Sequence, residues 1–292
     1  MKHNFNKGLL LTSIGSFWWG FLGVLYFQYV SFIGHIELVV HRCLWTFVML
    51  VVTTTFLSKW KIFFKIITNK IYLISLLASG FLIFLNWAVW IYAVATERII
   101  DASFGYFIMP ILSVLLGYIF FNENLNKKRI FSIILVLISI LILIFFSFKS
   151  LPWVGIIVAL SWAFYNLIRK KINIDTDVGL LIESLYILPF ALVVFYLITK
   201  NGFNDFSLSN PGLSLFLILA GPMTVIPLFL YVRGVELIGL GPTGMIFYIT
   251  PTLQFVLGYF YYNEDFSIIK FLSFIIIWIA VIIYLKDLYE TR

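Results

Sequence analysis

The sequence is poor in the residues on which most enzymes and secreted proteins depend. Its 292 residues include one cysteine and three histidines, and only 11% of the side chains are charged. A single cysteine, Cys43, excludes an intrachain disulfide and a zinc site built from several cysteines. No GxxxxGK[S/T] sequence is present, so we do not expect this chain to hydrolyse a nucleotide. Catalytic residues, metals and cofactors are all expected to be absent.

The composition indicates a membrane protein. Hydrophobic residues make up 62% of the chain, aromatic residues 20%, and the mean hydropathy is +1.06. A soluble domain carries about 25% charged residues, more than twice the share found here. The net charge of +7 is divided among short clusters between apolar runs, so nucleic acid is not an expected partner. The lipid bilayer is therefore the expected solvent for this fold.

Ten apolar runs each have the length of a transmembrane helix. Such a helix needs about 20 apolar residues, whereas the strands of a membrane barrel alternate over about ten. The runs are unbroken and joined by short connections, which predicts an all-α polytopic protein. We place the spans at about 8–30, 36–57, 71–95, 102–121, 130–148, 153–168, 178–199, 213–235, 242–262 and 268–285.

The distribution of lysine and arginine predicts the orientation. If the N-terminus is cytoplasmic, 14 of the 20 basic residues fall in cytoplasmic segments and four in outer loops. Loops on the cytoplasmic side carry such an excess. We therefore expect an integral plasma (inner) membrane protein with both termini in the cytoplasm.

One stretch of the sequence occurs twice. Residues 106–123 (YFIMPILSVLLGYIFFNE) return 141 positions later at 247–264 (FYITPTLQFVLGYFYYNE), with eight identities in 18 positions. The first copy is span four and the second is span nine. The chain thus divides into two five-helix units, residues 1–149 and 150–292. Since each unit has an odd number of spans, the second is inverted in the bilayer, as is common in secondary transporters.

These repeats resemble the EamA domains of the drug/metabolite transporter superfamily. Both copies keep a proline, then Leu-Gly-Tyr, then Asn-Glu. Further runs are similar to the RarD branch of that superfamily: ELVVHR at 37–42, LNW at 85–87, ASFGYF at 102–107, RKK at 169–171 and LIE at 181–183. The resemblance covers essentially the whole chain.

The resemblance implies a secondary active transporter, or permease, for a small amphipathic metabolite, amino acid or drug. Spans one, three, four, six, eight and nine would line a central cavity, and spans five and ten would pack at the periphery. Access would alternate around a site near the midplane. The expected partners are a small-molecule substrate and the bilayer, with proton coupling left open, and no obligatory protein partner is evident. The alternatives are a membrane channel or structural scaffold and, as a third, a polytopic membrane enzyme.

Polar and aromatic residues inside the spans are the candidates for the cavity. Asn86 and Trp90 are one helical turn apart in span three, with Trp87 beside them, and they could bind an amphipathic solute by stacking and hydrogen bonding. Packing between helices is the alternative role. The full set of candidate cavity residues is Trp18 with its neighbour Trp19, Asn86, Trp90, Tyr106, Asn166, Arg233 and Tyr248.

A second set of residues is predicted to serve coupling or gating, because ionisable groups at membrane depth are paired or line a wet cavity. Glu37 and His41 share one face of span two and could form either a proton relay or a structural pair. Arg42 lies close enough to the end of this span for its side chain to extend to the interface. Glu183 faces either the cavity or the basic cluster at 169–171. Arg233 has Glu236 as an alternative partner.

Pro110 and Pro251 complete the gating set. Each lies near the middle of a copy of the repeat, where proline removes one helical hydrogen bond and frees a carbonyl. We expect paired kinks that line the cavity, either as hinges or as static bends.

Overall fold

The computed structural model describes all residues except 1, 96–98, 148–152, 262–267 and 292. Within these described residues every regular element is a helix, which confirms the all-α prediction. Seven helical stretches are long and apolar enough to cross a membrane, and Gly105–Phe121 is a shorter apolar helix.

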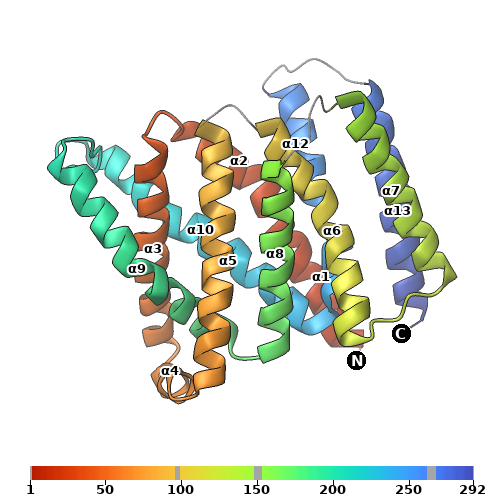
Figure 1. The fold of residues 1–292 in the computed structure, drawn as a ribbon, viewed down its shortest axis with the longest axis horizontal. Helices are drawn as coiled ribbons and strands as arrows, with labels where there is room; N and C mark the ends of the chain where they lie inside the picture. The colour runs from red at the N-terminus through yellow and green to blue at the C-terminus, as the bar shows by residue number, and fades with distance from the viewer. Residues whose placement is uncertain (1, 96–98, 148–152, 262–267, 292) are drawn as a thin grey trace.

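The ten predicted spans correspond in order to helical segments of the structure (Figure 1). Span one is divided into three parts, and span nine into two. The segments are α1, η1 and α2 (Lys2–Phe17, Trp18–Gly23, Val24–Tyr29), α3 (His35–Phe56), α5 (Lys70–Ala95), α6 (Ile99–Phe121), α7 (Lys127–Ser147), α8 (Trp153–Ile172), α9 (Thr176–Lys200), α10 (Pro211–Ile238), α11 and α12 (Leu240–Ile246, Ile249–Phe260) and α13 (Ile268–Glu290).

A short helix that we did not predict, α4 (Trp60–Ile67), connects α3 and α5. It lies at one end of the bundle, beside the lower ends of both helices (Figure 1). Phe63 and Ile66 are buried, whereas Lys61 is exposed. This amphipathic pattern is typical of a helix that lies along a membrane surface.

The two copies of the repeat run in opposite directions. The C-terminal end of α6 is at the lower end of the bundle in Figure 1, and that of α12 is at the upper end. Helices α7 and α13 pack against each other at the outer edge, where Ser139 Oγ donates to the backbone oxygen of Ser273 over 2.9 Å. Spans five and ten are therefore peripheral, as the resemblance implied.

Span nine is broken where its proline predicts a break. Helix α11 ends at Ile246 and α12 begins at Ile249, so the break lies three to four residues before Pro251. A proline ring clashes with the carbonyl four residues earlier and leaves it without its usual amide partner. Here the backbone oxygen of Phe247 accepts instead from the amide of Thr250 at 2.9 Å. Pro110, by contrast, lies within a continuous α6.

Glycines allow two of the helix crossings around the centre. A Cβ atom at Gly105 would lie 2.6 Å from the backbone oxygen of Gly155, and one at Gly221 would lie 2.5 Å from that of Trp45. Helix α6 can therefore approach α8, and α10 can approach α3, more closely than larger residues would permit.

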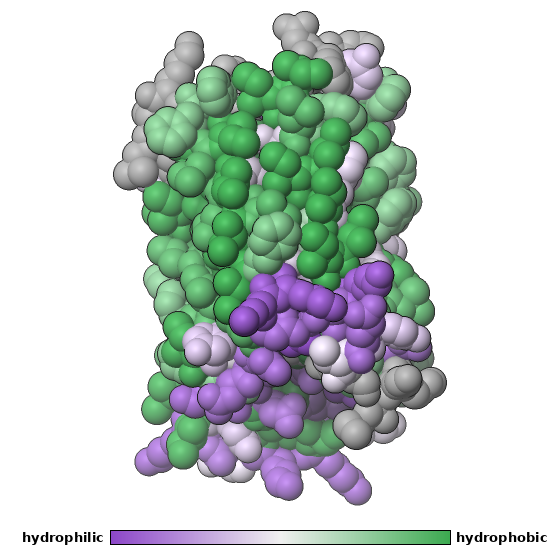
Figure 2. All heavy atoms as spheres, turned by 90° about the vertical axis from the view of Figure 1, so that its right-hand side faces the viewer, coloured by the Kyte–Doolittle hydropathy of each residue, from purple (hydrophilic) through white to green (hydrophobic). Residues whose placement is uncertain are grey.

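The surface divides into an apolar shaft and a hydrophilic end. On the face shown in Figure 2, apolar residues cover the upper part, and hydrophilic residues gather at the lower end. Both termini lie at this lower end (Figure 1). We call it the basic end, because residues 127–129, residues 169–171 and the residues of α4 are found there. The pattern is that of a membrane-embedded bundle.

Candidate functional site

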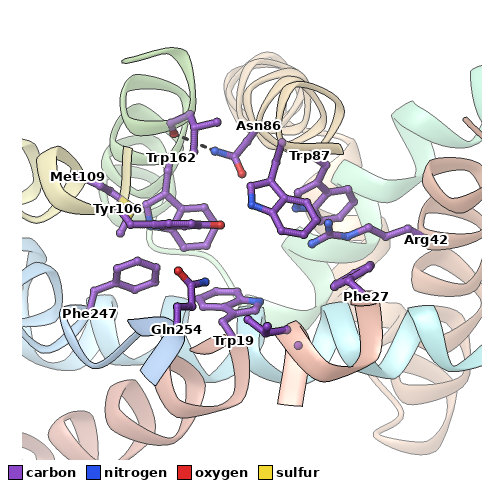
Figure 3. A pocket seen from close by; sticks show the side chains of 14 residues that line it. Trp19, Phe27, Arg42, Asn86, Trp87, Tyr106, Met109, Trp162, Phe247 and Gln254 are labelled. Carbon is purple, nitrogen blue, oxygen red and sulfur yellow. Dashed lines mark hydrogen bonds between the residues drawn. The ribbon is translucent and has the colours of Figure 1, made fainter. Parts of the chain in front are cut away.

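A cavity of about 80 Å³ lies between the two halves of the bundle (Figure 3). Its walls come from η1, α2, α3, α5, α6, α8 and the α11–α12 segment. The lining residues are Trp19, Gly23, Val24, Phe27, Arg42, Asn86, Trp87, Trp90, Tyr106, Met109, Val158, Trp162, Phe247 and Gln254. Most of these walls are apolar or aromatic, with a few polar groups, which is the usual character of a small-molecule site.

The cavity lies in the half of the bundle that is farther from the basic end. Its residues on α5 lie in the C-terminal half of that helix, and those on α6 and α8 lie in the N-terminal halves. These three helix ends are at the top of Figure 1, opposite the chain termini.

Arg42 points into this cavity and does not extend to the interface, so the sequence-based expectation for its direction was wrong. The side chain is 7% exposed, and its Nε donates to Thr224 Oγ1 over 3.0 Å. The guanidinium carbon lies 4.5 Å from the ring centroid of Trp87 and 5.1 Å from that of Phe27. Both distances are within the range of cation–π attraction.

Asn86 presents an acceptor to the same cavity. Its Nδ2 donates to the backbone oxygen of Val158 at 2.8 Å and to Ser161 Oγ at 3.1 Å, both on α8. The amide nitrogen is therefore engaged by the neighbouring helix. The amide oxygen is turned toward the space between Trp162 and Trp87 (Figure 3).

Aromatic rings close the deep side of the cavity. Trp19 meets Trp162 edge to face with ring centroids 5.1 Å apart, and Tyr231 and Phe247 pack on the same pair. Edge-to-face and tilted contacts at such distances are favourable. Trp162, Tyr231 and Phe247 are all buried. Span one is π-helical over Trp18–Gly23, and this turn determines which of its two tryptophans faces the cavity.

A polar layer borders these rings on the side of the basic end. Glu183 accepts from Ser79 Oγ at 2.5 Å and from Tyr165 at 3.3 Å, and it forms an ion pair with Arg169 at 3.5 Å. Glu183 and Arg169 are 2% and 1% exposed, respectively. Glu183 therefore pairs with the basic cluster, which is the structural one of its two predicted roles. A buried pair of this kind is costly to break.

Glu123 forms a clasp on the same side of the cavity. Its two carboxylate oxygens accept from the backbone amides of Leu240 and Gly241, each at 2.8 Å, and Lys170 Nζ donates to it at 2.9 Å. The clasp thus joins the end of α6, the first turn of α11 and α8. A carboxylate at a helix N-terminus is favourable because it meets free amides and the positive end of the helix dipole.

Glu37 and His41 lie outside the cavity and do pair with each other. Glu37 Oε1 accepts from the amides of Asp205 at 2.9 Å and Phe206 at 3.2 Å, and it lies 3.4 Å from His41 Nε2. Trp45 Nε1 donates to His41 Nδ1 over 3.2 Å, so the proton of a neutral ring belongs on Nε2, facing Glu37. The cluster attaches α3 to the loop before α10.

Of the predicted cavity residues, the structure brings Asn86, Trp90 and Tyr106 together, with Trp19 and Trp87 beside them. It places the other four elsewhere. Trp18 directly precedes the lining residue Trp19. Asn166 donates to the backbone oxygen of Trp162 at 2.9 Å, Tyr248 donates to that of Phe107 at 2.8 Å, and the half-exposed Arg233 pairs with Glu236 at 2.6 Å.

The two prolines of the predicted gating set lie near the cavity without lining it. Neither Pro110 nor Pro251 is among the lining residues, but the residue four positions before each of them is. Because proline has no N–H, the backbone carbonyls of Tyr106 and Phe247 lose their usual helical hydrogen bond.

Sequence reasoning missed Gly23, Val24, Phe27, Met109, Val158, Trp162, Phe247 and Gln254. Most of these are apolar residues in apolar helices, and no sequence pattern distinguishes an apolar residue that lines a cavity from one that packs between helices. Phe247 had a signal, because it occupies the position of Tyr106 in the second copy of the repeat. No group of three or more metal-binding side chains occurs in the part of the chain that was described.

Comparison with known proteins gives consistent matches over the whole chain. The model of the EamA-like transporter family matches residues 6–145 and again 150–286. The chain is 32% identical to Protein RarD of Escherichia coli over 98% of this chain and 96% of that one. It is also 32% identical to the uncharacterized transporter YojE of Bacillus subtilis, over 95% and 93% of the two chains. A solved crystal structure superposes with a TM-score of 0.71 at 12% identity, covering 96% and 97%, and so shows the fold alone.

Proposed function

The chain belongs to the EamA-like transporter family, and from that premise we propose a secondary active transporter that works by alternating access in the plasma (inner) membrane. Its cargo is a small amphipathic solute of the metabolite, amino acid or drug class. The observation that carries this proposal is a cavity between the two halves that, among the described residues, has a buried polar layer on the side of the basic end and a half-buried rim on the other.

The polar layer makes the two sides of the cavity different. On the side of the basic end, a solute would meet the rings of Trp162 and Tyr231, then the Glu183–Arg169 pair, then the Glu123 clasp. On the other side, the half-buried Phe27, Trp90 and Gln254 form the rim. This asymmetry supports a conformation that is accessible from one side of the membrane.

The orientation follows from the basic residues. The basic end faces the cytoplasm because lysine and arginine are enriched there, and both termini are on that side. The conformation described is then outward-facing, with its cytoplasmic side closed. The opposite state requires the clasp and the buried pair to separate while the outer rim closes, by rocking of the two inverted halves.

Labelling of a single cysteine tests the proposal. Cys43→Ala removes the native thiol, and Gln254→Cys places a new one on the cavity wall. In proteoliposomes of known orientation, an impermeant maleimide applied to the outer side should label position 254 readily, and the same reagent inside should label it slowly. Ser209→Cys and Lys286→Cys, both at exposed positions, serve as references for the two sides.

The alternative functions give different results. A channel would be labelled rapidly from both sides at once. In a scaffold, the rates at which position 254 is labelled from the two sides would stay the same under any condition that drives solute exchange. Either result would refute alternating access at this cavity.

A further inference from the structure

Arg42 is a buried cation without an acidic partner. Within the described part of the chain, no carboxylate oxygen lies within 4.0 Å of its guanidinium nitrogens, since every ion pair there involves other residues. The titratable groups that influence it are the thiol of Cys43 and the phenols of Tyr26 and Tyr106. Its hydrogen bond to Thr224 uses Nε, so the two terminal nitrogens remain for a ligand.

Other buried arginines of this protein are neutralised. Arg169 pairs with Glu183 at 3.5 Å, and Arg129 pairs with Asp287 at 2.9 Å. Burying an unpaired charge is costly, and removing a partner from such a pair is strongly destabilising. Arg42 differs from these two because it lines a cavity, where a bound solute can supply the missing charge.

The cavity selects among the anions that a guanidinium can bind. Among the described lining residues Arg42 is the one charged side chain. The cavity can therefore neutralise a ligand that carries a single negative charge. A carboxylate carries one charge and matches the planar fork of arginine, whereas a phosphate monoester carries almost two at pH 7. The surrounding rings of Trp19, Trp90 and Tyr106 suit a flat apolar body.

Asn86 adds a further requirement. Its nitrogen is already engaged by α8, so it offers the cavity an acceptor and no donor. A solute that places an N–H or O–H beside its carboxylate would satisfy that oxygen. An amide, a hydroxyl or an ammonium group would each fulfil this role.

Resting on the proposed function, we propose that the solute is a small organic monocarboxylate with a planar apolar body and a hydrogen-bond donor near the carboxylate. Arg42 binds the carboxylate, Asn86 accepts from the donor, and the aromatic walls stack on the body. In the absence of solute, the guanidinium is held by Thr224 and by the faces of Trp87 and Phe27.

A series of small phenyl compounds that differ in their polar group tests this assignment. The probes are 3-phenylpropionate, 3-phenyllactate, 3-phenylpropionamide, phenethylamine and phenyl phosphate, with binding to the purified protein followed by the fluorescence of its cavity tryptophans. We expect 3-phenyllactate to bind best, 3-phenylpropionate next, and the neutral, cationic and phosphate members at least about tenfold more weakly, as for a charge-assisted hydrogen bond.

Variants locate the selectivity. Arg42→Gln should reduce binding of both carboxylates at least about tenfold and leave that of 3-phenylpropionamide unchanged. Arg42→Lys keeps the charge, so it should retain part of the preference for carboxylates over the amide. Such a result would also show that the position tolerates substitution. Arg233→Gln removes a cation outside the cavity, so it is the matched control and should behave as the wild type.

Three results would overturn the assignment: equal binding of the amide and the carboxylates, a preference for phenethylamine or phenyl phosphate, or no binding of either carboxylate. Each of them leaves the proposed function in place if labelling still shows that the side of the membrane from which position 254 is accessible can change. Failure of the labelling experiment, by contrast, would refute transport through this cavity whatever the protein binds.

Discussion

The rings of Tyr106 and Phe247 meet in the cavity with their centroids 5.9 Å apart, and each residue lies four positions before a proline. The two are equivalent positions of the repeat, separated by the same 141 residues. Beside them, Tyr248 OH donates at 2.8 Å to the backbone oxygen of Phe107, which is its own counterpart in the first copy. The two halves thus contact each other through equivalent residues, and at this contact span nine is broken before Pro251 whereas α6 continues through Pro110.

Pro251→Ala should impair transport without unfolding the protein. A helix able to run through residues 247–251 would turn Phe247 away from Tyr106, so we expect solute exchange to fall at least about tenfold. The free energy of unfolding should change by no more than about 1 kcal/mol, since alanine is compatible with a helix. Pro211→Ala, at the first turn of α10, is the control. Normal exchange by Pro251→Ala would show that the break is not required.

Lys170→Met should weaken the closure that we propose for the cytoplasmic side. Lys170 donates to the Glu123 clasp at 2.9 Å, whereas its neighbour Lys171 is exposed. Both substitutions remove one positive charge from the same helix end, so Lys171→Met is a matched control. We expect only the change at position 170 to accelerate labelling of a cysteine at position 254 from the cytoplasmic side. Equal labelling rates in the two variants would contradict a closing role for the clasp.

Gly179→Ala should be strongly destabilising. A Cβ atom at this position would occupy the space of the Arg169 guanidinium and displace it from Glu183. Breaking a buried pair costs about 3–5 kcal/mol, so the melting temperature in detergent should fall sharply. Gly212→Ala is the control, because its Cβ would approach only Asn210 Oδ1, at 3.9 Å. A melting temperature unchanged by Gly179→Ala would show that the pair adapts without cost.

Glu37→Gln tests the two predicted roles of the Glu37–His41 pair. The carboxylate holds two backbone amides of the loop before α10 and lies away from the cavity, so we expect a structural role. The variant should lose about 1–3 kcal/mol of stability, as for a weakened buried hydrogen-bonded group. Its pH profile of solute exchange should match that of the wild type. A flattened profile in a folded variant would instead support a proton relay.

The sequence predicts the fold well because its signals are regular and local. Span lengths, the excess of basic residues in alternate connections and the copied stretch at 106–123 are all visible without tertiary information. Asn86 and Trp90 could be placed on one face because α5 keeps a regular helical period through them.

The missed features depend on irregular or long-range geometry. A π-helical turn changes the register of span one, so a regular helix could not tell Trp18 from Trp19. Arg42 is near enough to the end of α3 to reach either the interface or the cavity, and only the position of Thr224 on α10 selects the latter. The Glu123 clasp joins residues 117 positions apart, which no local pattern encodes.

The most direct test of alternating access is the side from which a cysteine at position 254 is labelled when the clasp is broken. In a Cys43→Ala, Gln254→Cys background, Glu123→Gln removes the charge that holds Lys170 and the first turn of α11. We predict that labelling from the cytoplasmic side then increases while labelling from the outer side decreases. If outer labelling stays the same, or if both rates rise together, the two halves do not alternate around this cavity.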